Sequence, residues 1–407
     1  GGAALYKPQF AYSMLRSFQG SLQSFSRFSR DIRFLQALAQ AAFVVLVVVV
    51  ARWLLGNLFD ALDTRGLDLS FGFLSRTAGF PVADEALPLE RSDSFLDAYF
   101  VGLANTLQVV VVGLILATAL GIFTGISLLS SNWLLRTISQ AYVELMRNTP
   151  LLVQLFFLYF GVILKLPSLA ERITVGPIIL SNRGLFFPRA LPQASSRPWI
   201  LLVGVSVVLA IAIYRTRMDR RVRSGAETRP ALWAAVPLFG LPLLGWLVLP
   251  GQPFTADLPQ LEGLRIAGGS RLSPEFAAIL FGLVIYTAAF IAEIVRSGIL
   301  SVPHGLREAS LAGGLSRTQT LRLVVLPVAL RVIIPPTTNQ YLNLAKNSSL
   351  AIGVGYPDLY SISQTIFNQS GQAVQVIAMM MGTYLALSLI ISAGMNFINA
   401  RLKIRER

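Results

Sequence analysis

The sequence contains no cysteine and a single histidine, His304, among 407 residues. Without thiols the chain can form neither disulfide bonds nor thiolate metal sites, and one imidazole cannot build a metal centre alone. Lysine is also scarce: there are four, and none follows a glycine as the phosphate-binding loop G-x-x-x-x-G-K-[ST] requires. The inventory therefore predicts a chain without catalytic activity, so that any ATP hydrolysis must occur on another polypeptide.

Charged residues are few as well. They make up 13% of the chain, whereas soluble domains usually carry about 25%. Because 54% of the residues are hydrophobic, lipid is predicted to be the main solvent. A net charge of +14 would in principle suit a nucleic acid, but the arginines gather in short loops between apolar runs. That distribution is typical of membrane topology, so no nucleic-acid partner is expected.

Eight apolar runs are long enough to cross a bilayer, which takes roughly 20 helical residues. They lie at about 35–56, 99–128, 141–164, 199–214, 231–249, 275–298, 323–345 and 374–399. We therefore predict an all-α, polytopic membrane protein with about eight transmembrane helices. The first run is followed by Arg52 and lacks the A-x-A-like cleavage site of a signal peptide. It is therefore expected to be a retained span. Residues 1–34 form either an interfacial amphipathic helix or a solvated tail.

Charges in the loops predict the orientation. The stretch 215–229 holds six arginines and should be cytoplasmic, which also places the 129–140 loop and both termini in the cytoplasm. The 57–98 loop, with eight acids and three arginines, is expected outside. The 165–198 loop is an exception to the rule, because it carries five basic residues and one acid on the external side.

One polar segment, 304–322, differs from the apolar runs on both sides of it. A helix-tolerant stretch is followed by the pair Gly313–Gly314, which permits the positive φ that commonly ends a helix. Ser316, with Gln319 three residues later, has the pattern of a capping box for a second short helix. The segment is predicted to form a compact cytoplasmic knob of two short helices. The alternative is an ordinary cytoplasmic loop that is basic because of its topology.

The spacing inside and after this segment is specific. Glu308-Ala309-Ser310, three residues, Gly314, nine residues and then Val324-Val325-Leu326-Pro327 resemble the E-A-A-x3-G-x9-I-x-L-P signature of permease subunits of binding-protein-dependent ABC importers. Ser310 stands where that signature has alanine. The runs 142–161 and 341–355 are similar to the polar amino-acid permeases of this superfamily. The long 57–98 loop and the extra spans near 199–249 resemble the longer permeases of general L-amino-acid importers.

This resemblance implies a type I ABC importer permease core and an importer of L-amino acids in the bacterial inner membrane. It implies these parts: a cytoplasmic N-terminal segment (1–34), a first span with a long external loop (35–98), and a permease domain (99–400) with an inserted pair of spans (about 165–274). The implied partners are a second, different permease, two ATPase subunits that bind ATP and Mg, a periplasmic amino-acid-binding protein and the lipid membrane. The chain itself is expected to hold no cofactor and no metal.

In that family the segment equivalent to 304–322 docks in a groove of the ATPase subunit. The resemblance therefore implies that the knob carries the ATPase contact. The implied coupling residues are Arg307, Glu308, Ala309, Leu311, Ala312, Gly314 and Leu315.

Polar side chains inside the seventh span suggest a substrate pathway, because such residues are expensive in lipid. Prolines 335–336 are expected to kink or break this helix. Arg331 either anchors a substrate carboxylate or pairs with Glu293 or a lipid phosphate. The neighbouring amides either contact an amino-acid zwitterion or bond between helices, and Lys346 either snorkels or receives a carboxylate. The predicted pathway residues are Asn105, Arg331, Asn339, Gln340, Asn343 and Lys346.

A secondary transporter or channel acting without an ATPase is the alternative function. It would need coupling carboxylates within the membrane, and only Glu293 and Glu144 lie near it. Each has an arginine three residues away with which it can pair, Arg296 and Arg147. A membrane scaffold without transport would leave the polar seventh span unexplained. The sequence therefore favours a non-catalytic permease subunit.

Overall fold

The computed structural model describes residues 32–64, 70–82, 89–225, 229–263 and 265–402. The chain divides into two units, Gly1–Phe71 and Gly72–Arg407. In the first unit, α2 (Ile32–Thr64) contains the predicted first span, and the residues of that span whose burial is described are exposed. The amphipathic helix considered for residues 1–34 lies almost entirely outside the described residues.

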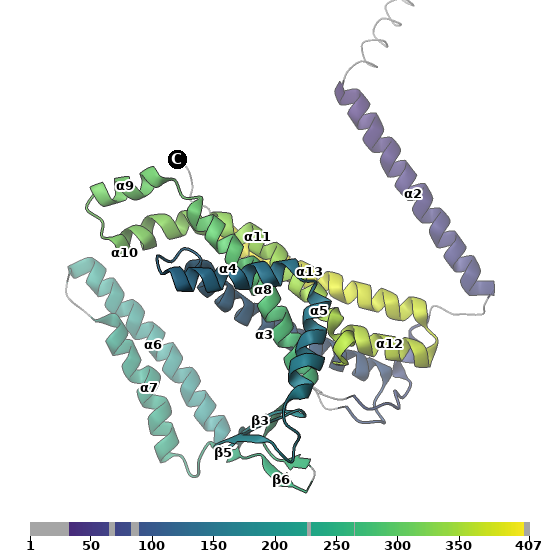
Figure 1. Cartoon of the computed structure of the whole chain (residues 1–407), viewed down its shortest axis with the longest axis horizontal. Helices are drawn as coiled ribbons and strands as arrows, with labels where there is room; N and C mark the ends of the chain where they lie inside the picture. The colour runs from purple at the N-terminus through teal and green to yellow at the C-terminus, as the bar shows by residue number, and fades with distance from the viewer. Residues whose placement is uncertain (1–31, 65–69, 83–88, 226–228, 264, 403–407) are drawn as a thin grey trace, which may run out of the picture. The chain divides into compact units, whose positions relative to one another are not determined.

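The second unit is built around four long helices (Figure 1): α3 (Phe95–Ser127), α8 (Pro274–Leu300), α11 (Leu326–Asn347) and α13 (Ala373–Leu402). Helices α3 and α8 pack closely because small residues recur every four positions on α3. A Cβ at Gly121 would lie 2.6 Å from Ile291 Cβ, and one at Gly125 would lie 2.7 Å from the carbonyl oxygen of Ala292. Small residues at this spacing let membrane helices approach backbone to backbone.

The third predicted span, 141–164, is not a continuous helix, which corrects the prediction. Helix α4 (Trp133–Asn148) ends before Pro150, and the chain turns by 110° into α5 (Leu151–Phe156). The second arm continues as the π-helical η2 (Phe157–Val162) and the 3-10 segment η3 (Ile163–Lys165). Much of the predicted 129–140 loop therefore belongs to α4.

Gln154 holds this corner together. Its buried side-chain amide donates to the carbonyls of Met146 and Thr149, both at 2.9 Å. A turn of this kind leaves helix-end carbonyls without intrahelical donors, and in an apolar environment they must be satisfied by side chains. The residues of the R-N-T-P-L-L-V-Q run thus form a structural corner, with Pro150 opening it and Gln154 bonding across it.

Two further helices, α6 (Ser196–Ser224) and α7 (Pro230–Val248), form an antiparallel hairpin. The predicted 199–214 span was too short, because α6 continues through most of the arginine-rich stretch that was expected to be a loop. The hairpin is joined near its basic end by Arg217, whose guanidinium lies 4.2 Å from the centroid of the Trp233 ring. At the other end the Trp199 indole donates to the carbonyl of Pro242 at 2.9 Å.

Short strands flank this hairpin in the described chain, and the sequence did not predict them. The strands before it are β1 (Ile173–Val175), β2 (Ile178–Ser181), β3 (Gly184–Phe187) and β4 (Arg189–Pro192). Those after it are β5 (Phe254–Asp257), β6 (Gln260–Glu262), β7 (Arg265–Ala267) and β8 (Ser270–Leu272). They form sheets ordered β1-β2-β3-β8, β4-β5 and β6-β7, all antiparallel. Pairs β3–β8 and β4–β5 close the insertion, because each joins a strand before the hairpin to one after it.

The seventh predicted span is α11, preceded by the short helices α9 (His304–Ala312) and α10 (Arg317–Thr320) and by the π-helical η4 (Leu321–Val325). Prolines 335–336 were expected to kink or break this helix, and the break is wrong because α11 is continuous there. Thr337 and Thr338 donate to the carbonyls of Ile333 and Ile334, beside the carbonyls that the prolines leave unbonded. The irregular backbone lies instead at the ends, in η4 and in the 3-10 segment η5 (Ser348–Val354).

The remaining elements cover the end of α3 that is distant from α9. They are the 3-10 turn η1 (Gly72–Ser75) and α12 (Leu359–Ser370). Phe73 and Phe95 pack with Ile362 and Val376 in a cluster separate from the main core. Seven helices of the described chain are long and apolar enough to cross a membrane, or eight if α4 and α5–η3 together count as one span. The predicted mostly helical, polytopic fold with about eight spans is confirmed.

Candidate functional site

The polar segment 304–322 folds as two short helices that project beyond one end of α8 (Figure 1). Helix α9 ends in a Schellman turn: Leu315 N–H donates to Ser310 O at 3.1 Å, and Gly314 N–H donates to Leu311 O at 3.0 Å. Gly314 has φ +85°, a left-handed conformation that glycine adopts without strain. The fixed glycine of the signature is therefore required by the backbone at the turn.

The second helix begins with the predicted capping box. Ser316 Oγ accepts from Gln319 N–H at 3.3 Å, and Gln319 Oε1 accepts from Ser316 N–H at 2.8 Å. Ser310, which replaces the alanine of the signature, donates to Thr320 Oγ1 at 3.1 Å. This bond ties α9 to α10, so the departure from the signature adds a contact within the knob.

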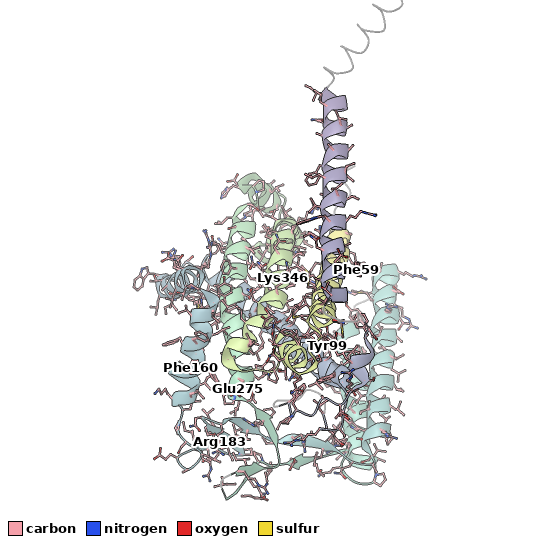
Figure 2. The ribbon with its side chains drawn as sticks, turned by 90° about the vertical axis from the view of Figure 1, so that its right-hand side faces the viewer. Phe59, Tyr99, Phe160, Arg183, Glu275 and Lys346 are labelled. Carbon is pink, nitrogen blue, oxygen red and sulfur yellow. The ribbon has the colours of Figure 1, made fainter. Side chains whose placement is uncertain are left out.

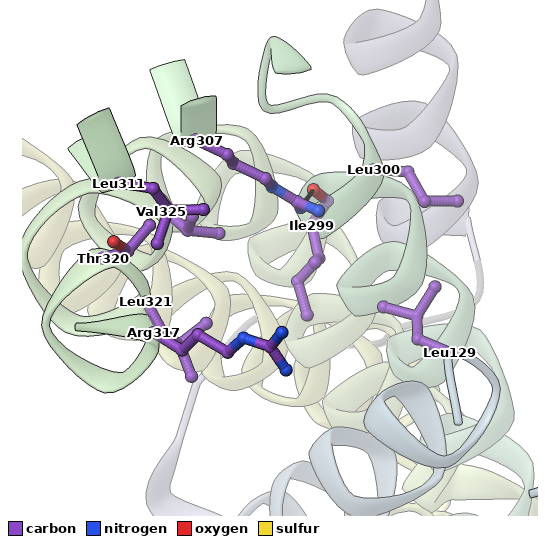
Figure 3. Close-up of a pocket in the computed structure, with 9 residues that line it drawn as sticks. All are labelled: Leu129, Ile299, Leu300, Arg307, Leu311, Arg317, Thr320, Leu321 and Val325. Carbon is purple, nitrogen blue, oxygen red and sulfur yellow. Dashed lines mark hydrogen bonds between the residues drawn. The ribbon is translucent and has the colours of Figure 1, made fainter. Parts of the chain in front are cut away.

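A cavity of about 520 Å³ lies between the knob and the ends of α3 and α8 (Figure 3). Its lining is mostly apolar, with Leu129 and Ile299 on one side and Leu311 and Val325 on the other. Arg307 reaches across this space and donates to the Ile299 carbonyl at 2.9 Å. Because a cavity replaces dense packing, the knob is connected to the core mainly through the chain at its two ends and through this arginine.

The predicted coupling residues divide into two groups. Arg307 and Leu311 line the cavity, and Leu315 is half-buried at the turn. Four residues are exposed on the outer surface of the knob: Glu308, Ala309, Ala312 and Gly314. Glu308 contacts only its helix neighbour His304 among the described ion pairs, at 3.1 Å. The fold does not use this outer surface, so it is available to another protein.

Helix α11 carries an exposed stripe along most of its length. Val332, Pro336, Asn339, Asn343 and Lys346 fall at spacings of three or four and are all exposed in the chain. Gln340 is half-buried beside the stripe. Figure 2 labels Lys346 near the end of α11 that leads into η5. Two amides and an ammonium facing lipid would be costly, so this stripe requires a protein partner or water in the membrane.

Arg331 lies near the other end of α11, about two and a half turns after the knob ends at residue 322. Its Nε and one terminal nitrogen are enclosed, and neither makes a hydrogen bond within the described chain. Glu293 is not its partner, because that carboxylate forms a two-pronged ion pair with Arg296 whose shortest N···O distance is 2.5 Å. The guanidinium of Arg331 is therefore a buried donor group available for a carboxylate.

A second, polar cavity of about 310 Å³ adjoins this ion pair between α4 and α8. It is lined by Glu144, Arg147, Glu293 and Arg296 among others. The ion pair considered for Glu144 and Arg147 does not occur among the described residues. Arg147 instead lies over the ring of Phe290, 5.4 Å from its centroid. The charge of Glu293 is thus balanced by Arg296.

Comparison with known families shows which family of proteins this chain belongs to. Residues 117–404 match the family described as "Binding-protein-dependent transport system inner membrane component". The chain belongs to this family. The match covers α8, the knob, α11 and the corner at Pro150, and it extends into α13.

Relatives within this family are similar over nearly the whole chain. One is the putative amino-acid ABC transporter permease protein YhdX of Escherichia coli, 43% identical, covering 91% of this chain and 94% of that protein. The general L-amino acid transport system permease protein AapQ of Rhizobium johnstonii is 39% identical, covering 95% and 97%. The glutamate/glutamine/aspartate/asparagine transport system permease protein BztB of Rhodobacter capsulatus is 36% identical, covering 93% and 96%.

The structure places Asn105, the remaining predicted pathway residue, in a tie between α3 and the segment before α12. Its side chain is fully buried and donates to the Pro357 carbonyl at 2.8 Å. Next to it, Thr106 Oγ1 accepts from Leu359 N–H at 2.9 Å. A pathway role for Asn105 stays a prediction, whereas its hydrogen bond joins α3 to the segment before α12.

Sequence reasoning did not single out Asp358, which belongs to this tie. The carboxylate caps α12 by accepting from Ser361 N–H at 2.9 Å, and Tyr384 OH donates to it at 3.3 Å. Burial raises the pKa of Asp358 to about 7, despite these hydrogen bonds, which lower it. The local signal was an aspartate at a helix start, but its burial depends on α3 and α13, which lie far away in sequence.

Proposed function

We propose that this chain is one of two permease subunits of an ATP-driven importer of L-amino acids. The second permease is a different chain of the same family, and two ATPase subunits bind ATP and Mg. A soluble binding protein delivers the amino acid from outside. The chain resides in the bacterial inner membrane with both termini in the cytoplasm, as the arginines near the ends of its spans favour.

The observation that carries this proposal is the uncovered outer surface of the knob at 304–322. Its exposed residues Glu308, Ala309 and Ala312 have no packing role within the described chain. Small side chains allow a partner to approach closely, and Glu308 offers a charge for an ion pair at the contact. ATP-driven closure of the ATPase subunits would move the knob, and the cavity beneath it gives the knob room to shift.

The exposed polar stripe on α11 supports the second permease. A membrane helix that presents Asn339, Asn343 and Lys346 away from its own core needs a counterpart. Two such helices from two permeases would enclose a polar path between them. Neutral amides and cationic groups suit the zwitterion of an amino acid, and Arg331 adds a donor for its carboxylate.

The names of the relatives support the substrate class. Two relatives that are similar over nearly the full length are described as an amino-acid and a general L-amino-acid permease. Another is described as carrying glutamate, glutamine, aspartate and asparagine. We therefore propose α-amino acids as the cargo, with the binding protein setting much of the selectivity.

Charge reversal at Glu308 tests the ATPase contact. Glu308→Lys is expected to lower uptake by more than about tenfold, because a reversed charge within an interface costs several kcal/mol. The matched control is Asp219→Lys, the same charge change at an exposed position at the basic end of α6. Both variants should reach the membrane in wild-type amounts. Normal uptake and normal co-purification of the ATPase in Glu308→Lys would contradict the proposal, as would uptake by the wild type without ATP.

A further inference from the structure

The eight short strands form a folded module at the end of α8 that is remote from the knob. We define the β module as residues 166–195 and 250–273. Helix α8 begins directly after it at Pro274, and its 27 residues end next to α9. A helix of that length rises about 40 Å, more than the hydrocarbon core of a bilayer. The β module and the knob therefore lie on opposite sides of the membrane.

Several contacts anchor the β module to the helical core. Leu272 packs against the main core cluster, and Ser273 caps α8 by accepting from Phe276 N–H at 3.0 Å. Tyr159, on the arm that leads into the module, donates to Glu275 at 2.7 Å. Figure 2 shows Glu275 at the strand-bearing end of α8 and Arg183 among the strands. A force on the module would therefore reach α8 and the α5–η3 arm directly.

One border of the module is apolar and uncovered. Strand β1 forms an edge of the four-stranded sheet, so its outer backbone groups have no strand beside them among the described residues. Ile173 is 45% exposed, Val175 is 68% exposed, and Ile178 in the adjoining strand is 40% exposed. Exposed edges with apolar side chains invite pairing with another chain, and natural proteins normally cover or blunt them.

The module is also basic. Its residues, 166–195 and 250–273, hold five basic residues and three acids, a net charge of +2. Two of those acids lie beside arginines of the same module: Asp257 at 3.2 Å from Arg189 and Glu262 at 4.0 Å from Arg265. Arg183 and Arg271 are exposed next to each other, since Arg271 Nε donates to the Arg183 carbonyl at 3.1 Å.

The positive charge of the β module is unusual for an external segment of a membrane protein. External loops of membrane proteins carry few lysines and arginines, because positive loops are retained in the cytoplasm. The module keeps its arginines on a folded surface on the side opposite the knob. A positive surface beside an apolar edge fits an acidic protein surface with an apolar centre, since such pairs steer association and then exclude water.

We propose that the β module is the docking platform for the importer's soluble amino-acid-binding protein. The binding protein places acidic side chains against Arg183 and Arg271 and covers the β1 edge at Ile173 and Val175. This inference rests on the proposed function, because it assumes that the knob is cytoplasmic and that a binding protein exists. It assigns the docking contact to the insertion, and it gives a reason for the basic 165–198 loop.

The test uses the complete transporter in lipid nanodiscs and the purified binding protein of the same transport system. The double variant Arg183→Glu with Arg271→Glu is expected to weaken binding by more than about tenfold, and wild-type binding should weaken as salt is added. Val175→Asp, at an exposed position, should also weaken it several-fold, because it removes an apolar contact and adds a charge that repels an acidic partner. Arg183→Lys with Arg271→Lys should retain most of the affinity, because the charge is kept.

The matched controls lie at the basic end of α6, a helix of 29 residues that begins directly after residue 195 of the module. Arg220→Glu with Arg221→Glu, and Val222→Asp, make the same chemical changes at exposed positions and should leave affinity unchanged. The amount and melting temperature of each purified complex show whether a variant is folded.

The outcomes separate the inference from the function on which it rests. If the wild type binds the binding protein and the reversed double variant binds within about twofold of it, the docking inference is wrong. If the double variant instead loses the second permease, or loses only a dependence on anionic lipid, the module serves another partner and the inference is again wrong. If the wild type retains neither an ATPase nor a binding protein, the proposed function itself fails.

Discussion

In α8, 67% of the membrane-crossing window is buried within the chain, whereas in α6 and α7 the values are 11% and 6%. All three helices are long and apolar enough to span a bilayer. The difference lies in the side chains. Helix α8 presents alanines such as Ala288 and Ala292 to α3, while α6 and α7 present large groups such as Val208 and Leu243 outward. Apolar side chains allow a helix to lie in lipid, whereas small side chains allow two helices to pack closely against each other.

Exposed side chains in this chain have two different kinds of surroundings. Exposed residues of α6 and α7 are mostly apolar, as lipid contact requires. The exposed stripe of α11 holds Asn339, Asn343 and Lys346 and therefore marks a surface meant for protein or water. Variants in the buried contacts and on the two kinds of exposed surface test this distinction.

The largest effect is expected at the α3–α8 contact. Gly125→Val would place a Cβ 2.7 Å from the Ala292 carbonyl, a backbone atom that cannot turn aside. The two helices would have to separate, at a cost of about 3 kcal/mol or more. Gly240→Val in α7 is the matched control, because nothing lies within 4 Å of a Cβ there. Melting temperature and yield of the purified complex measure both. Equal stability of the two variants would contradict the assignment of α3–α8 as the structural core.

A transport effect is expected from the polar stripe. Asn339→Leu removes an amide from the proposed path and should lower uptake by roughly tenfold, in line with the loss of a hydrogen bond to a charged ligand. Val208→Leu changes an exposed position of α6 and should leave uptake unchanged. Initial rates over a range of amino-acid concentrations provide the measurement. Unchanged kinetics and specificity in Asn339→Leu would remove this residue from the pathway.

Local chemistry explains which parts of the site the sequence predicted. The knob followed from Gly313–Gly314 and from the Ser316–Gln319 capping box, interactions that span a few residues. The corner at Pro150 was missed because the apolar run continues on both sides of it. The strands were missed because β3 and β8 pair across the whole hairpin, and no local pattern records that pairing. The orientation of Arg331 and the polar stripe depends on packing among helices, so only the residue types were predictable.

A smaller effect, on pH dependence, is expected at the tie between α3 and α12. The pKa of Asp358 is raised from 3.8 to about 7 in the folded chain, so the folded state holds this proton more tightly than the unfolded state between those values. Stability should therefore fall as pH rises from about 4 to about 7 and then level off. Asp358→Asn can still cap α12 and should flatten this dependence. Melting temperatures between pH 4 and pH 8 test it, and an unchanged slope in the variant would exclude Asp358 as its source.

The smallest effect on the core is expected from removing the hairpin itself. Gln193 N–H donates to Pro253 O at 3.0 Å, so residues 194–252 can be replaced by an Asn-Gly turn that continues the β4–β5 ladder. Two spans are lost together, which preserves the topology of everything that follows. Because few side chains of α6 and α7 contact the core, the melting temperature should change by only a few degrees, within the range of about 1 kcal/mol. A second deletion that also removes β3 to β8 is the control, because it takes Leu272 away from the core cluster, uncovers the start of α8 and should destabilise the core. If the shorter deletion unfolds the chain as completely as the longer one, the hairpin is part of the core and the comparison with α8 is wrong. If only uptake falls, the hairpin acts through its lipid-facing surface or a partner, and the core is independent of it.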